Sequence, residues 1–176
     1  MPLNAIKRWS YFSALKKHLN KPSGMLSGSV STNPARSFLI LFNGTDPKNV
    51  DFFKALHSKF EKTGIKVKML AFVQTKEDSL DFGMAMYNEN NIKWNLLPEQ
   101  KLTELVRNKS FDILFHINPE QLTHLHFLGV AAKADFKIST LSDLPNDFNL
   151  TVKTGKSLGL PEIFQHMKDC LDKLSI

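Results

Sequence analysis

Residues 154–157 read TGKS, which matches the end of a phosphate-binding loop. In such a loop, glycine backbone N–H groups surround the phosphates and the lysine contacts them, and a second glycine lies five residues before the Gly-Lys pair. This chain has Leu150 at that position. We therefore expect no nucleotide hydrolysis at this segment.

Three histidines, His116, His124 and His126, are close enough in sequence to suggest a metal site. On a helix, residues two apart point about 200° apart, so His124 and His126 cannot share one ion. No cysteine or carboxylate stands at a matching ligand spacing. His116 falls in an apolar strand pattern, which favours a buried, hydrogen-bonded imidazole over a general base. Ser139 and Thr140 show no serine–histidine–aspartate ordering, and we predict no metal, cofactor or catalytic residues.

The sequence NGTDPK at residues 43–48 follows a buried strand pattern and could form a ligand-binding turn. Asp46 precedes Pro47, which predicts a helix start capped by the aspartate. Asn118 and Pro119 repeat this arrangement and predict a second capped start. Backbone N–H groups at helix starts can hold an anion, but the Asp46 carboxylate competes for them, so a plain capped turn is the alternative. The residues expected nearest a ligand are Asn43, Gly44, Thr45, Asp46, Gln74, His116 and Asn118.

The N-terminal 36 residues carry the whole positive excess of the chain. They hold six basic residues and no acidic one, so the other 17 basic residues balance the 17 acidic ones. Aromatic residues, Trp9 among them, are interleaved with these charges. Such a surface can neutralise phosphates while aromatic rings stack or pack. The residues expected to bind a polyanion are Lys7, Arg8, Trp9, Lys16, Lys17, Lys21 and Arg36.

Residues 2–20 are predicted to form a helix, followed by a linker rich in Ser, Gly and Pro. A helical wheel places the apolar residues of this segment on one broad arc: Ala5, Ile6, Trp9, Phe12, Leu15 and Leu19. An anionic membrane surface is a second possible partner. The third alternative is that the helix docks on the rest of the chain and keeps its lysines in water. We divide the chain into an arm and linker at 1–36 and a domain at 37–176.

Strands and helices are predicted to alternate after residue 36. Strands are expected at 38–42, 66–73, 111–117, 136–140 and 149–153, with a further short one at 83–87. Helices are expected at 50–62, 98–107, 119–132 and 161–174, the last with Leu174 among its inward residues. This order indicates a single Rossmann-like, doubly wound, mainly parallel sheet of about five strands. Strands 66–73 and 111–117 should flank the first one, so the turns at 43–48 and 117–121 should meet where such sheets bind ligands.

The remaining composition indicates a protein of the cytoplasm. The single cysteine, Cys170, excludes an internal disulfide framework and falls in an apolar helical pattern. No apolar run approaches the roughly 18 residues that would indicate a transmembrane helix. The basic N-terminus is not followed by a signal-peptide core.

Two families share patterns with this chain. The run from FDILFHINPE through HFLGVAAKADFKIST resembles the N-terminal Rossmann half of heptosyltransferase-type glycosyltransferases. Over nearly the whole chain, the order of ILFNGTDP, KVKMLAFV, NNIKWNLLP, FDILFHI, AAKADFKI and FNLTVKT resembles a family of unknown function from Bacteroidota. The first resemblance implies a module that binds a small molecule or nucleotide-sugar together with a partner chain, and the second implies no activity.

We therefore expect a non-enzymatic Rossmann-like protein whose basic arm engages RNA, a ribonucleoprotein or another acidic partner. The lack of an assembled catalytic set favours this interpretation, although enzymatic activity stays open. The alternative is the glycosyltransferase-like module, with a small-molecule ligand that the sequence does not name.

Overall fold

The computed structural model describes residues 3–19, 35–77, 84–155 and 157–174, and the structural findings below concern these residues. Lys21, most of the 20–36 linker, Gly83 and Lys156 of the TGKS segment lie outside them. The helices are α1 Leu3–Leu19, α2 Pro47–Lys62, η1 Glu89–Asn91 (a 3₁₀ helix), α3 Gln100–Arg107, α4 Thr123–Ala131 and α5 Leu160–Lys173. The strands are β1 Ser37–Asn43, β2 Lys66–Phe72, β3 Ala85–Tyr87, β4 Phe111–Ile117, β5 Ala134–Thr140 and β6 Leu150–Val152.

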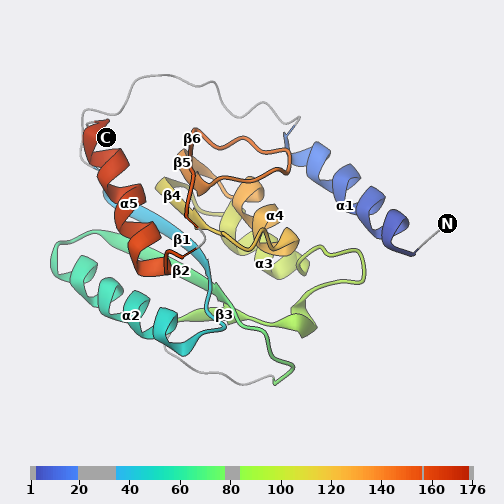
Figure 1. Cartoon of the computed structure of the whole chain (residues 1–176), viewed down its shortest axis with the longest axis horizontal. Coiled ribbons are helices and arrows are strands. Elements are labelled where there is room, and N and C mark those ends of the chain that lie inside the picture. The colour runs from blue at the N-terminus through green and yellow to red at the C-terminus, as the bar shows by residue number, and fades with distance from the viewer. Residues whose placement is uncertain (1–2, 20–34, 78–83, 156, 175–176) are drawn as a thin grey trace.

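All six strands form one parallel sheet in the order β3-β2-β1-β4-β5-β6 (Figure 1). The expected arrangement of β2 and β4 on either side of β1 is confirmed. Phe42 of β1 pairs with Ile117 of β4, so the turns that follow these two strands leave the same edge of the sheet. The doubly wound α/β fold predicted from the sequence is therefore present.

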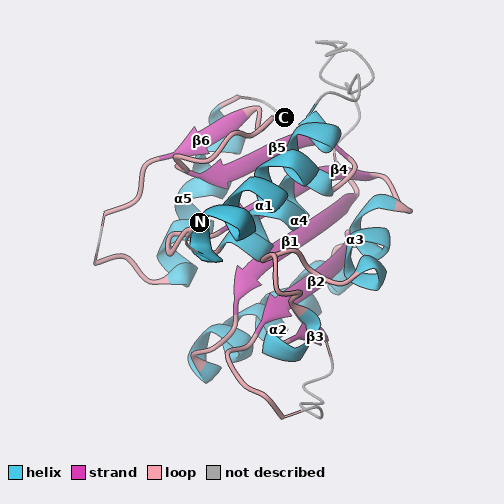
Figure 2. Ribbon diagram, turned by 90° about the vertical axis from the view of Figure 1, so that its right-hand side faces the viewer, coloured by secondary structure: helices cyan, strands magenta, loops and turns pink. Residues whose placement is uncertain are grey.

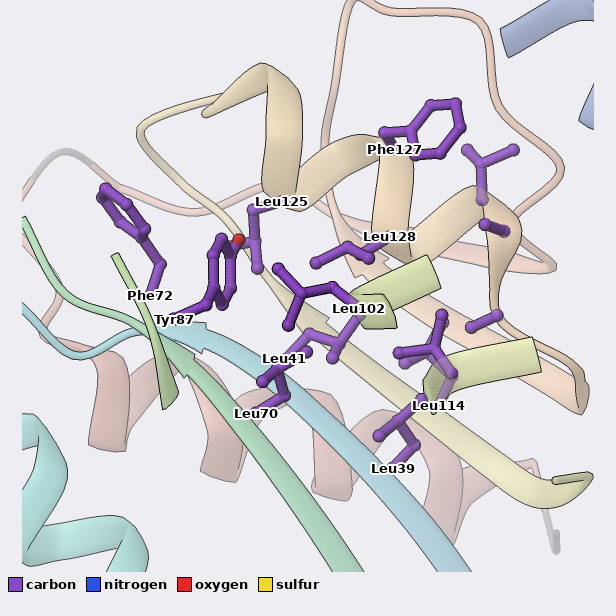
Figure 3. Packing of buried hydrophobic residues seen from close by; sticks show 14 of the residues in the cluster. Leu39, Leu41, Leu70, Phe72, Tyr87, Leu102, Leu114, Leu125, Phe127 and Leu128 are labelled. Atoms are coloured by element: carbon purple, nitrogen blue, oxygen red, sulfur yellow. The ribbon is translucent and has the colours of Figure 1, made fainter. Parts of the chain in front are cut away.

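Helices cover both faces of the sheet, which explains why β1 has no polar alternation. Leu39 and Leu41 face a cluster that includes residues of α1, α3 and α4, and Figure 3 shows them opposite Leu125 and Leu128 of α4. The alternate residues of β1, with Ile40 at their centre, face α2 and α5. Figure 2 shows α1 lying outside α4, so α1 adds a further helix to that face.

Several helix boundaries and burial predictions differ from the structure. The helix expected to open at Asn118 and Pro119 begins only at Thr123, and α3 begins at Gln100, two residues after Pro98. Leu174, expected to face inward, is 50% exposed because α5 ends at the residue before it.

No helix in the described ranges combines the length and apolar character needed to cross a membrane.

Candidate functional site

The turn after β1 is held in shape by its own polar groups. The Gly44 N–H donates to the Phe72 carbonyl at 2.7 Å, and a Cβ atom at Gly44 would lie 3.1 Å from side-chain carbons of Ala71 and Val50. Glycine is therefore suited to this position by close packing. The Thr45 N–H donates to Asn43 Oδ1 at 3.0 Å, which folds the turn back on the strand end.

Two more of the predicted ligand residues complete this turn. The Gln74 N–H donates to Thr45 Oγ1 at 3.0 Å and joins the turn after β1 to that after β2. Asp46 Oδ1 accepts from the Lys48 N–H at 3.0 Å and caps α2, as predicted. The structure thus brings Asn43, Gly44, Thr45, Asp46 and Gln74 together, with polar atoms of each engaged within the protein.

Asn118 closes a loop instead of capping a helix, which corrects the prediction. Its Oδ1 accepts from the Leu122 N–H at 2.8 Å and its Nδ2 donates to the Leu122 carbonyl at 3.0 Å. Its backbone N–H donates to Thr140 Oγ1 at 3.1 Å. Gln121 takes a left-handed φ of 55°, and it lies in the turn that separates β4 from α4. The amide that satisfies both Leu122 groups leaves no cap for a helix at Pro119.

His116 lies in the core beneath α4, with its ring nitrogens directed at β5 and α4. Its Nδ1 is 2.7 Å from Ser139 Oγ and its Nε2 is 3.2 Å from the Leu125 carbonyl. The ring stacks on Phe148 at 5.1 Å between centroids, and a Cβ at Gly129 would come within 2.7 Å of it. Burial, followed by the nearby His126, lowers the pKa of His116 to about 3. The side chain is the buried, hydrogen-bonded imidazole that the strand pattern favoured.

The other two histidines point in different directions from α4. His124 Nδ1 is 2.9 Å from the Tyr87 hydroxyl, whereas His126 Nε2 is 3.0 Å from the Pro145 carbonyl. The described residues contain no group of three or more metal-ligating side chains placed to hold an ion.

A cavity of about 290 Å³ opens beside the ends of β2 and β3. Some of the polar residues that line it are hydrogen-bonded to one another. Asn88 Nδ2 donates to the Glu77 carbonyl at 2.8 Å, and Asn91 Oδ1 accepts from the Asn88 N–H at 3.1 Å. Sequence reasoning missed this cavity because its lining comes from several separate segments. The lining residues are Val73, Glu77, Met86, Tyr87, Asn88, Asn91, Lys101 and Leu102.

Helix α1 docks on α4 through a face that the helical wheel identified only in part. Tyr11 and Leu15 are buried, and the Tyr11 hydroxyl donates to the Thr123 carbonyl at 3.0 Å. Tyr11 and His18 also contact the Phe127 ring. Burial raises the pKa of the Tyr11 phenol, so it stays a neutral donor.

The outward face of α1 carries the predicted polyanion-binding residues. Arg8, Lys16 and Lys17 are exposed, Lys7 is half-buried, and Trp9 is 72% exposed. Ala5 and Ile6, expected on the packed arc with Trp9, are exposed as well, because the packed face is centred on Tyr11 and Leu15. The structure therefore gathers Lys7, Arg8, Trp9, Lys16 and Lys17 on one helix.

Arg36 belongs to a different part of the molecule. Its backbone N–H donates to Asp112 Oδ2 at 2.6 Å beside the start of β1. Sequence reasoning also missed Trp94, which is 63% exposed in the turn before α3. The contact between that turn and α1 joins segments some 85 residues apart, through Asn95 and Ser10, and only the fold shows it.

The model of a family of unknown function (DUF6913) matches residues 7–174 of this chain. No curated protein and no solved structure matches the chain.

Proposed function

The chain belongs to DUF6913, whose function is unknown, and from the geometry of α1 we propose a non-enzymatic Rossmann-like protein whose basic N-terminal helix binds RNA. The RNA is free or part of a ribonucleoprotein, and its phosphates are the acidic groups that the helix recognises. In the turn after β1, the Asn43, Thr45 and Asp46 side chains accept hydrogen bonds from backbone N–H groups and hold the loops in place.

The observation that carries this proposal is the division of α1 into two faces. Tyr11 and Leu15 fix the helix on α4, so the opposite face is held at a fixed place on the surface. That face presents Lys16 and Lys17 to solvent, and Arg8 is exposed one turn before Tyr11, beside the docked face. Helix α1 has no acidic residue to offset these charges. Binding through such a surface is driven by phosphate neutralisation and counterion release.

The same docking argues against the membrane alternative. A basic amphipathic helix binds lipid by burying its apolar face in the headgroup region. In α1 the corresponding residues, Tyr11 and Leu15, already pack against α4. Lipid would have to displace that contact.

We expect the full chain to bind a single-stranded RNA of about 12 nucleotides in filter binding from about 50 to 200 mM salt. The variant Arg8→Gln/Lys16→Gln/Lys17→Gln should bind more weakly at low salt. Because a single strand gives a slope near −0.7 per neutralised phosphate, the slope of log K against log salt should become shallower by about 2.

The matched control removes three exposed charges on and beside α2, across the sheet from α1. Lys59, Lys62 and Lys66 are exposed, and their triple replacement by Gln lowers the net charge equally. It should leave the slope unchanged. Equal slopes for the two triple variants, or no binding by the parent chain, would refute the proposal.

The glycosyltransferase-like alternative has one supporting observation, the strand order, which is the order of dinucleotide-binding Rossmann domains. Strand order alone does not assign an activity. As part of the main proposal, we place the protein in the cytoplasm, where RNA is available. We also propose that the family comes from Bacteroidota, as the sequence resemblance implies.

A further inference from the structure

The turn that precedes α3 presents Trp94 to solvent. The Lys93 N–H donates to the Leu97 carbonyl at 2.8 Å, and the Leu96 N–H donates to the Lys93 carbonyl at 2.9 Å. Ile92 and Pro98 form an antiparallel bridge at the base of this turn. Trp94 is 63% exposed, although its size makes tryptophan a residue that is highly buried on average.

This turn is fastened to α1. Asn95 Nδ2 donates to Ser10 Oγ at 3.1 Å, and Asn95 Oδ1 accepts from the Leu97 N–H at 3.4 Å within the turn. Trp94 and Trp9 are therefore the immediate sequence neighbours of two residues that are hydrogen-bonded to each other. They are the only tryptophans of the chain, and both are exposed.

The charges around the two rings have one predominant sign. Lys93 is exposed next to Trp94, and Lys16 is exposed on the same side of α1 as Trp9, seven positions further along the helix. The acidic residue that follows the turn, Glu99, is paired with Lys101 at 2.8 Å. An anionic partner is therefore the electrostatic complement of this surface.

We propose that Trp9 and Trp94 form a stacking platform for single-stranded nucleic acid, each ring taking a base while Lys93, Lys16 and Lys17 contact phosphates. This inference rests on the proposed function and specifies its substrate as unpaired strands. Stacking on aromatic rings needs a splayed base and tolerates any sequence. The bases of a duplex are stacked on one another and offer no free face.

A second copy of this chain fits the surface less well. A two-fold dimer through α1 would place the same patch on itself, which brings the basic residues of one copy against those of the other. An acidic protein would satisfy the charges but would not use both exposed rings as stacking faces. The platform therefore favours a polyanion that carries planar bases.

The two tryptophans also provide the test, because Trp9→Phe leaves Trp94 as the only tryptophan and Trp94→Phe leaves Trp9. Phenylalanine preserves a stacking face, so each variant should still bind a uridine oligonucleotide of about 12 residues, with quenching of its remaining tryptophan. Trp94→Ala should weaken binding about tenfold, and Leu141→Ala, an exposed apolar control, should not. Inorganic polyphosphate and a duplex of equal length should bind more weakly and leave Trp94 unquenched.

The outcomes separate this inference from the proposed function. Unquenched Trp94 together with parent affinity for Trp94→Ala would overturn the platform, while a changed salt slope in the α1 triple variant would leave the proposed function standing. Equal binding of polyphosphate and the oligonucleotide would also overturn it, because charge alone would then suffice. A blue shift of tryptophan emission with phosphatidylserine vesicles, together with no binding of the oligonucleotide, would overturn both ideas in favour of a membrane surface.

Discussion

His116, His124 and His126 are buried, and burial is the main cause that lowers the pKa of each below its ordinary value of 6.5. For His116 and His124 the pKa falls to about 3 and about 4. In the unfolded chain these side chains take up protons near pH 6.5, whereas in the folded chain they stay neutral. Their contribution to stability is therefore complete above pH 6.5 and is lost as the pH falls below it.

We predict that the free energy of unfolding in urea falls between pH 6.5 and 4 by about 1 kcal/mol per pH unit for each of His116 and His124. His124→Gln keeps a polar partner for Tyr87 and should make this fall shallower. Parallel curves for the parent chain and His124→Gln would contradict this prediction.

Asp46 and Asn118 lie in turns of similar sequence, but the Asp46 side chain makes one hydrogen bond to the backbone and the Asn118 side chain makes two. Asp46→Ala removes one exposed cap and should cost about 0.5 to 2 kcal/mol of unfolding free energy in urea. Asn118→Ala should cost more, about 1 to 3 kcal/mol for each Leu122 group left unpaired. Asp46→Asn keeps an acceptor and should be nearly neutral. An Asn118→Ala cost no larger than that of Asp46→Ala would show that water replaces both of its hydrogen bonds.

At the scale of elements, α1 is an integral part of the core on the α4 side of the sheet. Leu15 is fully buried in that cluster, so Leu15→Ala should cost about 2 to 5 kcal/mol. Ile6, on the same helix, is 42% exposed, and Ile6→Ala should change the unfolding free energy by less than about 0.5 kcal/mol. Both values come from urea unfolding, and similar costs would mean that α1 does not dock as described.

The sequence predicted well those elements whose residue pattern follows from burial alone. The largely apolar sequences of β1 and β4 predicted strands buried on both faces of the sheet, and the structure shows this burial. A strand covered on two faces has no alternation of polar and apolar residues. Helix starts were predicted less well. Asp46 and Asn118 each precede a proline. The Asn118 side chain carries a donor as well as an acceptor, however, and it binds both the N–H and the carbonyl of Leu122. Composition alone does not distinguish these two outcomes.

For the whole molecule, the placement of β2 and β4 on either side of β1 followed from the alternation of strand and helix patterns, because right-handed crossovers leave few alternatives. The site was less accessible to sequence reasoning. The charge of α1 was visible in the composition, but its orientation depends on Tyr11 meeting Thr123. The Trp94 turn reaches α1 only through Asn95, a contact for which the sequence has no signal.

The Tyr11–Thr123 hydrogen bond joins residues 112 positions apart, which has a consequence during synthesis on the ribosome. Chains grow at about 5 to 20 residues per second, so α1 leaves the ribosome roughly 6 to 20 seconds before the segment that will receive it. During that interval Tyr11 and Leu15 have no surface to pack against. Helix α1 is thus made well before the surface on which it docks, and its basic side chains are carried on an undocked helix until α4 has been synthesised.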